Sequence, residues 1–600
     1  MTGIDAFIHP SVGFFLLAAI MPFLRAKDHS IWRWLLPLPP VFAILAVVFM
    51  PQGSFAGLDY LGNRLLFGRV DRLSIVFAHI FAIQSLLGMV FSMHVKDRAQ
   101  HAASCVYVGG AFGCVFAGDF ITLFIFWEMM SVASTFLVWL NKSPKSTAAG
   151  FRYFLFHIVG GLLLLAGTLL RYHEVGTFAF TAVTPGMAHT CDWLILAGFC
   201  VNAAVVPLHA WLPDAYPEAT VTGAVFMSAF TTKTAVYVLA RGFAGFEILA
   251  VMGVIMTIYG ASFATIENNA RRILAYHIVS QVGYMVAGIG IGTALTVNGA
   301  CAHAYAHILY KGLLFMAAGC VLYSTGTQKL TELGGLAYKL PWVMFLYMVA
   351  AVSISGWPLF NGFVSKTMTI TGAAEASHLW YHSWLALGME IAAVGTFLSV
   401  GIKLPYFAFF HKPGYDKPVK PIPKNMMVAM AGAAFLCFFT GVYPNFLYRL
   451  LPFTPVEYTP YTAWHVTQSL LLLSFTGLGF YLTRKIIVPH ARLNLDFDWF
   501  YRAFGRLGLA FAKRPLALVD GWWTEVYRKV GLNGLMKSAK ASRWFDENAV
   551  DGVVDGSAKT VMGAGGRFAS LQTGKLADYI GLALVLGMGI FVGYYLIFGS

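Results

Sequence analysis

Apolar runs of about 20 residues recur along most of the chain, with short polar links between them. A run of that length is enough for one helix to cross a hydrocarbon core about 30 Å thick. We count about sixteen such runs, which predict a polytopic helical membrane protein. They lie near residues 10–25, 33–50, 73–94, 103–117, 118–140, 151–171, 192–211, 220–240, 246–266, 273–293, 299–323, 341–372, 382–409, 425–445, 463–484 and 577–598.

Two of the runs, near 192–211 and 341–372, contain or are directly followed by helix-breaking residues at corresponding places. The residues concerned are Pro207, Pro213, Gly356, Pro358 and Gly362. A break at membrane depth is tolerated only where protein or a watery cavity satisfies the backbone. A matched pair of broken helices, five spans apart, indicates a transporter built from repeats. The alternative is that each proline only kinks a packed helix.

The segment 486–576 has a different character. Between Arg484 and Asp578 there are 15 Lys and Arg against 9 Asp and Glu. Apolar residues recur there at steps of three and four, which predicts an amphipathic helix lying along the membrane. These residues are Leu516, Val519, Trp523, Val526 and Val530. The alternatives are that this helix is broken near Pro515 or at Gly531 and Gly534, or that the segment is a plain cytoplasmic domain.

Composition agrees with a membrane protein and excludes several kinds of chemistry. Of the residues 58% are hydrophobic and 11% are charged, against about 25% charged in soluble domains. The seven cysteines show no CxxC pairing, and no glycine-rich nucleotide loop of the Walker type is present. We therefore expect no cofactor, no metal, no redox or ATP site and no nucleic-acid partner for this chain.

The positive charges predict an orientation. Loops that follow odd-numbered spans hold most of the Lys and Arg, so these loops should be cytoplasmic and both termini should lie outside. The first apolar run lacks a basic flank and is expected to be a retained span, not a cleaved signal. We expect a bacterial-type inner membrane or an equivalent energy-transducing membrane.

Ionisable residues interrupt several apolar runs. His303, His307 and Lys311 are spaced i, i+4 and i+8 in the stretch CAHAYAHILYK, so they share one helix face. An ionisable group at mid-membrane costs about 2.5 to 3.5 kcal/mol or more, which makes it a functional hypothesis by default. The spacing favours a file of proton carriers. The alternative is that the histidines bond neighbouring helices while Lys311 extends toward the interface.

Further polar groups lie in other runs. Glu128 stands alone in FITLFIFWEMM and needs a positive partner, for which Lys233 is a candidate, whereas Asp119 is expected to be a helix N-cap. Lys366 follows the second broken segment. The remaining candidates are His157, His209, His277, Glu390 and Lys403.

Five stretches carry a resemblance to a known family. They are FIFWEMM, VVPLHAWLPDAY, RRILAYHIVSQVGYM, AHAYAHILYKGLLFMAAG and SISGWPLFNGFVSK, spread from about residue 100 to 410. The chain thereby resembles the antiporter-like membrane subunits shared by respiratory complex I, Mrp-type sodium/proton antiporters and membrane-bound hydrogenases. Its end, from VDGVVDGSAKT onward, looks like the C-terminal extension of the largest complex I subunit of this kind.

The resemblance implies a fold of fourteen core helices with two inverted five-helix repeats, broken helices 7 and 12, a lateral helix and a final anchor. The implied divisions are 1–100 (helices 1–3), 101–245 (first repeat), 246–410 (second repeat), 411–485 (helices 14–15), 486–576 (lateral segment) and 577–600 (anchor). The implied proton axis consists of Glu128, Lys233, His303, His307, Lys311 and Lys366.

One position departs from the family pattern. Asn202 stands where the family usually has a lysine in the broken seventh helix, and asparagine cannot titrate. Either Lys233 pairs with Glu128 instead, or the first half-channel is impaired.

The expected function is proton translocation within a redox-linked or carbon-uptake-linked membrane complex. Alternatives are a sodium/proton exchange module of an Mrp-type antiporter and a non-pumping scaffold. The expected partners are other membrane subunits held by residues 486–576, the lipid bilayer, protons and, in the antiporter alternative, sodium.

Overall fold

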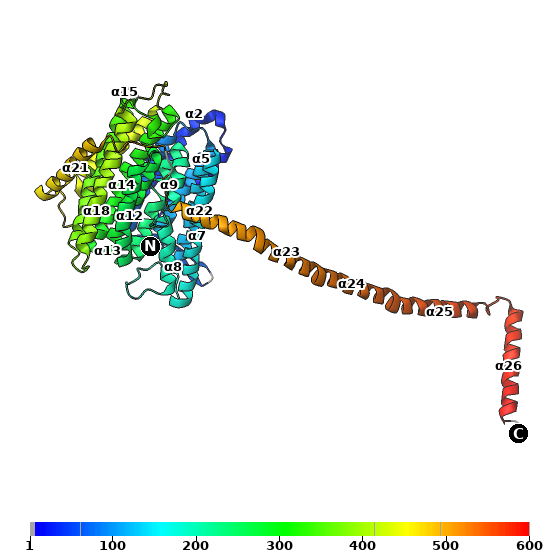
Figure 1. Cartoon of the computed structure of the whole chain (residues 1–600). Coiled ribbons are helices and arrows are strands. Elements are labelled where there is room, and N and C mark those ends of the chain that lie inside the picture. The colour runs from blue at the N-terminus through cyan, green and yellow to red at the C-terminus, as the bar shows by residue number, and fades with distance from the viewer. Residues whose placement is uncertain (1–6, 61, 413, 492–493, 599–600) are drawn as a thin grey trace. The chain divides into compact units, whose positions relative to one another are not determined.

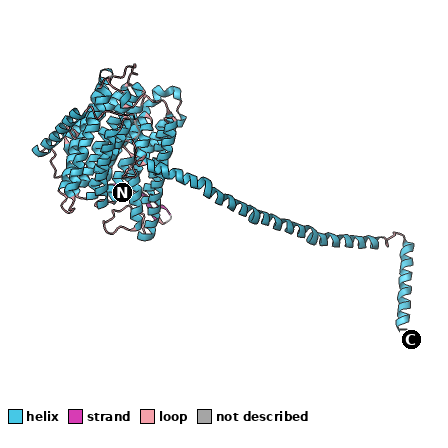
Figure 2. Cartoon of the chain, in the orientation of Figure 1, coloured by secondary structure: helices cyan, strands magenta, loops and turns pink. Residues whose placement is uncertain are grey.

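A computed structural model describes residues 7–598 apart from 61, 413 and 492–493, and it is almost entirely helical (Figure 2). The chain divides into two units, Met1–Asp498 and Trp499–Ser600. In the described residues, twelve helices are long and apolar enough to cross a membrane. The other four apolar runs correspond to α1, α5 and the two interrupted segments, so the predicted count of about sixteen spans stays a prediction. The prediction that both termini lie on the outer side of the membrane falls on residues 1–6 and 599–600, which are not among the described residues.

The first unit is a bundle of helices that run side by side (Figure 1). Its first part contains α1 (Ser11–Ile20), α2 (His29–Trp32), α3 (Leu38–Phe49), the antiparallel hairpin β1 (Gly53–Tyr60) with β2 (Asn63–Val70), and α4 (Arg72–Ser92). Next come α5 (Arg98–Phe116), α6 (Phe120–Trp139), α7 (Pro144–Val175), α8 (Thr190–Asn202), α9 (Trp211–Ala215), α10 (Val221–Met227) and α11 (Thr231–Gly242).

The second half of this unit repeats the pattern and then adds three helices. It contains α12 (Glu247–Ile266), α13 (Ala270–Ile291), α14 (Ala294–Thr325), α15 (Leu336–Lys339), α16 (Pro341–Ser355), α17 (Asn361–Ala374) and α18 (His382–Thr396), which continues into the π-helical η6 (Phe397–Lys403) and η7 (Tyr406–Phe410). The final helices are α19 (Lys424–Val442), α20 (Pro444–Tyr448) and α21 (Ala463–Thr483).

The repeat has a register of 150 residues. The helices α7 and α14 both have 32 residues, begin 150 residues apart (294 minus 144) and end at left-handed glycines, Gly176 and Gly326. The isolated bridge Asp119↔Ala179 recurs, with the same offset, as Asn269↔Lys329. Asp119 and Asn269 are also N-caps, of α6 and α13 respectively, which confirms the cap predicted at Asp119. The repeated architecture is therefore present in the backbone itself.

Both predicted helix breaks are confirmed. The helix α8 ends at Asn202 and helical structure resumes only at Trp211, with Pro207 inside the gap and Pro213 within α9. In the second repeat, α16 ends at Ser355, and its C-cap Gly356 has a φ of 83°, a left-handed conformation that glycine adopts most readily. Pro358 lies in the link before α17.

A third interruption was not predicted. The eighth span is divided between α10 and α11, although its sequence there, MSAFTT, contains neither Gly nor Pro. The Lys233 ammonium donates to the Ser228 carbonyl (2.7 Å) and the Thr232 hydroxyl (3.1 Å). A buried lysine thus bonds the backbone at the interruption.

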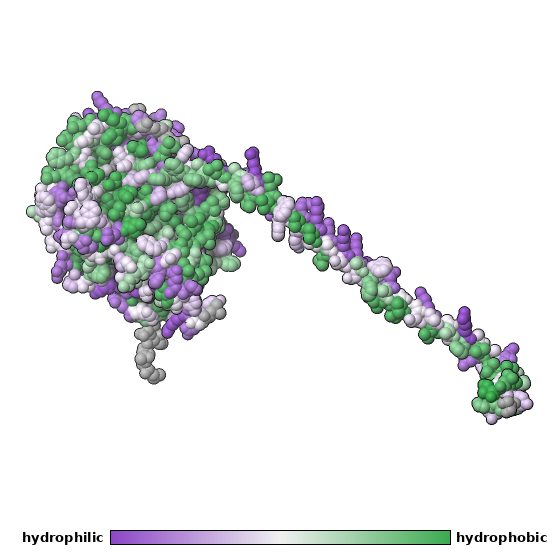
Figure 3. All heavy atoms as spheres, turned by 60° about the horizontal axis from the view of Figure 1, so that its bottom comes forward, coloured by the Kyte–Doolittle hydropathy of each residue, from purple (hydrophilic) through white to green (hydrophobic). Residues whose placement is uncertain are grey.

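The second unit is a continuous helical run followed by a separate apolar helix. The run contains α22 (Asp498–Phe511), η8 (Ala512–Leu516), α23 (Ala517–Val526), η9 (Tyr527–Leu532), α24 (Asn533–Phe545), η10 (Asp546–Val550) and α25 (Asp551–Ala569), and α26 spans Leu576–Phe598. Pro515 and Gly531 fall within π-helical turns instead of breaks. Hydrophobic and hydrophilic side chains alternate along its surface (Figure 3), as the amphipathic pattern predicted.

The second break depends on a close approach of two backbones. A Cβ added at Gly362 would lie 1.8 Å from the Ser353 carbonyl oxygen, whereas Gly479 in α21 has nothing within 4 Å. We predict that Gly362→Ala destabilises the protein by about 1 to 3 kcal/mol through overpacking. Thermal unfolding of the purified complex measures this, with Gly479→Ala as the matched control. Equal midpoints for the two variants would contradict the predicted contact.

Candidate functional site

The file of basic residues on α14 is fully buried. His303, His307 and Lys311 are each completely inaccessible to solvent. The Nδ1 atom of His303 lies 3.0 Å from the Ser365 hydroxyl, and its Nε2 lies 3.4 Å from the Tyr310 hydroxyl. Among the described residues, both nitrogens of His307 and the Lys311 ammonium have no hydrogen-bond partner. Buried polar groups normally have a partner, so these groups suit a path completed by internal water.

The file continues into neighbouring helices through further polar groups, of which His277 was a candidate in the sequence and Tyr310, Gln281, Thr396 and Ser399 were not. The Tyr310 hydroxyl donates to Gln281 Oε1 (3.4 Å) on α13, and the Gln281 amide donates to the Thr396 hydroxyl (3.3 Å) on α18. His277 lies 2.5 Å from the Ser399 hydroxyl. Tyr310 could have been found from its spacing, because it lies two turns beyond His303 on the same face.

Lys366 occupies the broken twelfth span. Its ammonium donates to the Ile354 carbonyl (2.6 Å) and lies 5.2 Å from the centre of the Tyr284 ring. In an unbroken helix the Ile354 carbonyl would accept from residue 358, but Pro358 has no N–H. The break therefore creates the acceptor that Lys366 uses.

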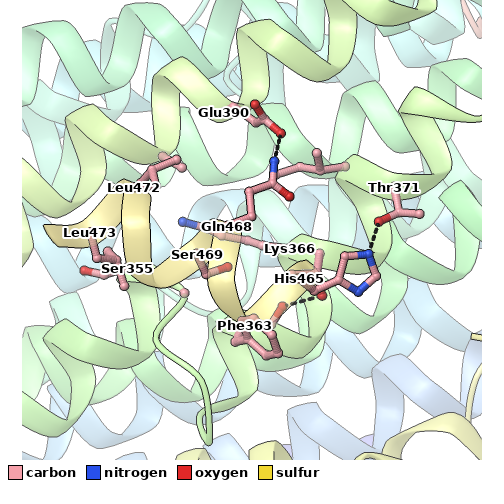
Figure 4. Close-up of a pocket in the computed structure, with 14 residues that line it drawn as sticks. Ser355, Phe363, Lys366, Thr371, Glu390, His465, Gln468, Ser469, Leu472 and Leu473 are labelled. Atoms are coloured by element: carbon pink, nitrogen blue, oxygen red, sulfur yellow. Dashed lines mark hydrogen bonds between the residues drawn. The ribbon is translucent and has the colours of Figure 1, made fainter. Parts of the chain in front are cut away.

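Lys366 also lines a cavity of about 60 Å³ between α17, α18 and α21 (Figure 4). This volume suffices for a few water molecules. On its wall, Gln468 donates to Glu390 (2.7 Å), and His465 lies 3.3 Å from the Thr371 hydroxyl. Glu390 was a predicted site residue, whereas Gln468 and His465 were not, because α21 carries no break and no charge that marks it.

The predicted pairing of Glu128 with Lys233 is wrong. No ion pair joins them among the described residues, and Glu128 Oε1 has no hydrogen-bond partner there. The carboxylate instead packs against Gly161 on α7, with Oε1 1.9 Å from the place of a Cβ. Lys233 belongs to the other side, where it interacts electrostatically with His307 and Lys311. The separation follows from α6 packing on α7 while α11 packs on α13 and α14.

Two further predicted residues lie together in the first repeat. The Nδ1 atom of His157 on α7 is 2.9 Å from Oδ1 of Asn202, the last residue of α8. Both side chains are fully buried. The structure thus places His157 at the first helix break.

Lys403 has the contacts of a helix cap. Its ammonium donates to the carbonyls of Thr265 (2.6 Å) and Glu267 (2.7 Å), at the C-terminal end of α12. Cations are favoured at this end of a helix. Lys403 therefore lies apart from the buried file.

His209, inside the first break, contacts a carboxylate that was not predicted. Its Nε2 lies 3.2 Å from Asp496 Oδ1, and the hydroxyls of Tyr259 and Tyr276 donate to the same carboxylate. Burial alone would raise the pKa of Asp496, but the hydrogen bonds and the charge of His209 outweigh it and hold that pKa well below its usual value. This cluster ties the link after α21 to α12 and α13.

The polar groups form two sets, one at the first break and one from α14 to the cavity. Among the described residues, no group of three His, Cys, Asp or Glu side chains could hold a metal ion. The arrangement places protonatable groups in a protein interior.

Comparison with known proteins gives the same class of membrane protein as the resemblance found in the sequence. Residues 117–392 match the family described as NADH:quinone oxidoreductase/Mrp antiporter, transmembrane. NADH-quinone oxidoreductase subunit N of Desulforudis audaxviator is 30% identical over 348 residues, which cover 53% of this chain and 69% of that protein. The chain belongs to this family of membrane proteins.

Two relatives extend the likeness beyond the family core. An Na(+)/H(+) antiporter subunit of Alkalihalophilus pseudofirmus is 27% identical over 639 residues, covering 97% of this chain and 74% of that protein. A chain from the structure of the archaeal membrane-bound sulfane sulfur reductase shares the fold, with a TM-score of 0.67 and 23% identity. That likeness covers 98% of this chain and 99% of the other.

The Asp496 cluster predicts a specific loss of local stability. We expect Asp496→Asn to expose the link after α21, because hydrogen bonds to a charged group contribute about 1.5 to 3 kcal/mol each. Limited trypsin digestion of the purified complex should then cut faster at Lys485.

Since the pKa of Asp496 lies below its unfolded value, its stabilisation is present above about pH 4 and is lost only as the pH falls further.

Asp416→Asn is the matched control, because Asp416 is exposed. Cleavage at Lys485 that is unchanged in Asp496→Asn would show that the cluster does not hold this link.

Proposed function

We propose that this chain is a proton-translocating, antiporter-like subunit of a multisubunit membrane complex. One observation carries the proposal: a buried row of protonatable groups extends from Lys233 along the α14 file to Lys366 and its cavity. Structural residues would be expected to have satisfied partners, but His307 and Lys311 have none among the described residues.

The mechanism follows from electrostatics between like charges. Lys311 interacts electrostatically with both Lys233 and Lys366. Two protonated lysines that interact in a weakly polarisable interior repel each other, so arrival of a proton at one favours release from the next. Release from Lys366 into the cavity would pass the proton to water beside Glu390.

The partners follow from the relatives and from the second unit. The relatives' names describe a subunit of an antiporter, a subunit of a quinone oxidoreductase and a respiratory membrane complex. The second unit exposes large apolar side chains along its length. We therefore assign residues 486–576 to contacts with other membrane subunits and with lipid. The membrane we propose is a bacterial-type inner membrane. We also propose that the two repeats extend over residues 101–245 and 246–410.

Sodium/proton exchange is the second candidate. It is favoured by the likeness to the Na(+)/H(+) antiporter subunit of Alkalihalophilus pseudofirmus, which extends over 97% of this chain. Under this candidate the cavity beside Lys366 would alternate between a proton on the lysine and a sodium ion near the Glu390 carboxylate. Transport that requires sodium on one side of the membrane would distinguish the two functions.

The central row predicts the outcome of two substitutions. In vesicles that contain the purified whole complex, we expect Lys311→Ala and Lys366→Ala each to lower the initial rate of pH-gradient formation at least tenfold. Each removes a protonatable group from the proposed path. A pH-sensitive dye inside the vesicles provides the measurement.

Lys329→Ala is the matched control, because Lys329 is exposed and its ammonium pairs with Glu332 at the surface. Transport at the wild-type rate in both Lys311→Ala and Lys366→Ala would reject proton translocation by this row and favour the scaffold alternative.

A further inference from the structure

The 150-residue register aligns the two long helices residue by residue. It pairs His157 of α7 with His307 of α14 (307 minus 157) and Gly161 with Lys311 (311 minus 161). Both histidines are completely buried. The first repeat therefore keeps one histidine of the α14 file and replaces its lysine by glycine.

The space left by Gly161 is filled by an acid. The Glu128 Oε1 atom lies 1.9 Å from the place where a Cβ of residue 161 would be. His157 and Gly161 are four residues apart, so they lie on one face of α7, about one 5.4 Å turn apart. The Glu128 carboxylate thus lies against α7 about one turn from the His157 ring.

The hydrogen bond to Asn202 fixes how His157 can act. The Asn202 Oδ1 atom only accepts, so the His157 Nδ1–H donates to it across 2.9 Å. In the neutral ring the lone pair then lies on Nε2, which is buried and has no partner among the described residues. An unpartnered basic nitrogen about one helical turn from a carboxyl group can receive its proton through intervening water.

Aromatic rings cover the rest of His157. Tyr153 from α7 itself and Trp211 from α9 pack on it, with ring centres 4.2 Å and 4.7 Å away. Glu128 from α6 is the acid on the same face, and Asn202 from α8 does not titrate. Of these groups, His157 is the titratable side chain on the α7 face against which Glu128 packs.

We infer that His157 carries the proton in the first repeat, in the role that the family resemblance assigns to a lysine at position 202. This rests on the proposed proton translocation. The protonated Glu128 carboxyl gives its proton to Nε2 of His157, which leaves a carboxylate beside an imidazolium. The imidazolium then releases that proton from Nε2 to internal water and returns to the neutral ring, and the Glu128 carboxylate takes up the next proton, so charge and protons balance over one cycle.

The first test compares substitutions in the whole complex reconstituted in vesicles. His157→Gln keeps a donor for Asn202 and removes the titratable ring, and we expect at least a fivefold loss of transport rate, similar to that of Glu128→Gln. The double variant should be no slower than Glu128→Gln alone, because the two groups act on one proton. His173→Gln, exposed near the end of the same helix, should stay within twofold of wild type.

The second test uses the pH profile, which a purely structural histidine would not move. Asn202→Asp keeps the shape of the side chain and places an anion at Nδ1, which favours the protonated ring. We expect the alkaline limb of the transport profile to move up by about one pH unit. Asn548→Asp, on an exposed position of η10, should leave the profile unchanged.

The outcomes separate this inference from the proposed function. Loss of transport in Lys311→Ala together with wild-type transport in His157→Gln would overturn the role of His157 alone. Wild-type transport in both would overturn proton translocation itself. Should His157→Gln fail to assemble, the profile of Asn202→Asp decides, and an unmoved alkaline limb rejects the inference.

Discussion

Two buried lysines in this protein each bond a main-chain carbonyl at an interrupted helix. Lys366 bonds the Ile354 carbonyl that Pro358 cannot satisfy, and Lys233 bonds the Ser228 carbonyl between α10 and α11. A charged group and an unpaired carbonyl are each costly in a membrane interior. Because each lowers the cost of the other, the buried lysine and the unpaired carbonyl stabilise each other at these two interruptions.

The sequence predicted most of this architecture because its signals are local. Apolar length, proline position and the i, i+4 spacing of His303, His307 and Lys311 are all signals within a single helix. The breaks after Asn202 and at Gly356 lie next to the prolines from which they were predicted. The contacts between helices could not be predicted in the same way. The Glu128–Lys233 pairing failed because charge complementarity alone does not say which faces meet, and the interruption at Ser228 has no Gly or Pro to mark it.

Other residues were missed because their roles depend on distant parts of the chain. Asp496 lies outside the apolar runs, yet it is buried against His209, Tyr259 and Tyr276. Gln468 and His465 look ordinary within α21 and matter only because they face Lys366 across a cavity. The 150-residue register was itself readable from the sequence, since Gly176 and Gly326 and the two His-Ile pairs at 157 and 307 share it.

The bond from Lys366 to Ile354 has a consequence for how the protein can change its charge. An ammonium has three N–H groups, and the neutral amine left after proton loss still has two. The oxygen of Ile354 can therefore keep a donor whether the lysine is charged or not. The backbone at this helix break therefore need not rearrange at each turnover. Lys366 can gain or lose charge where a proton would be released while the hydrogen bond that stabilises the break is kept.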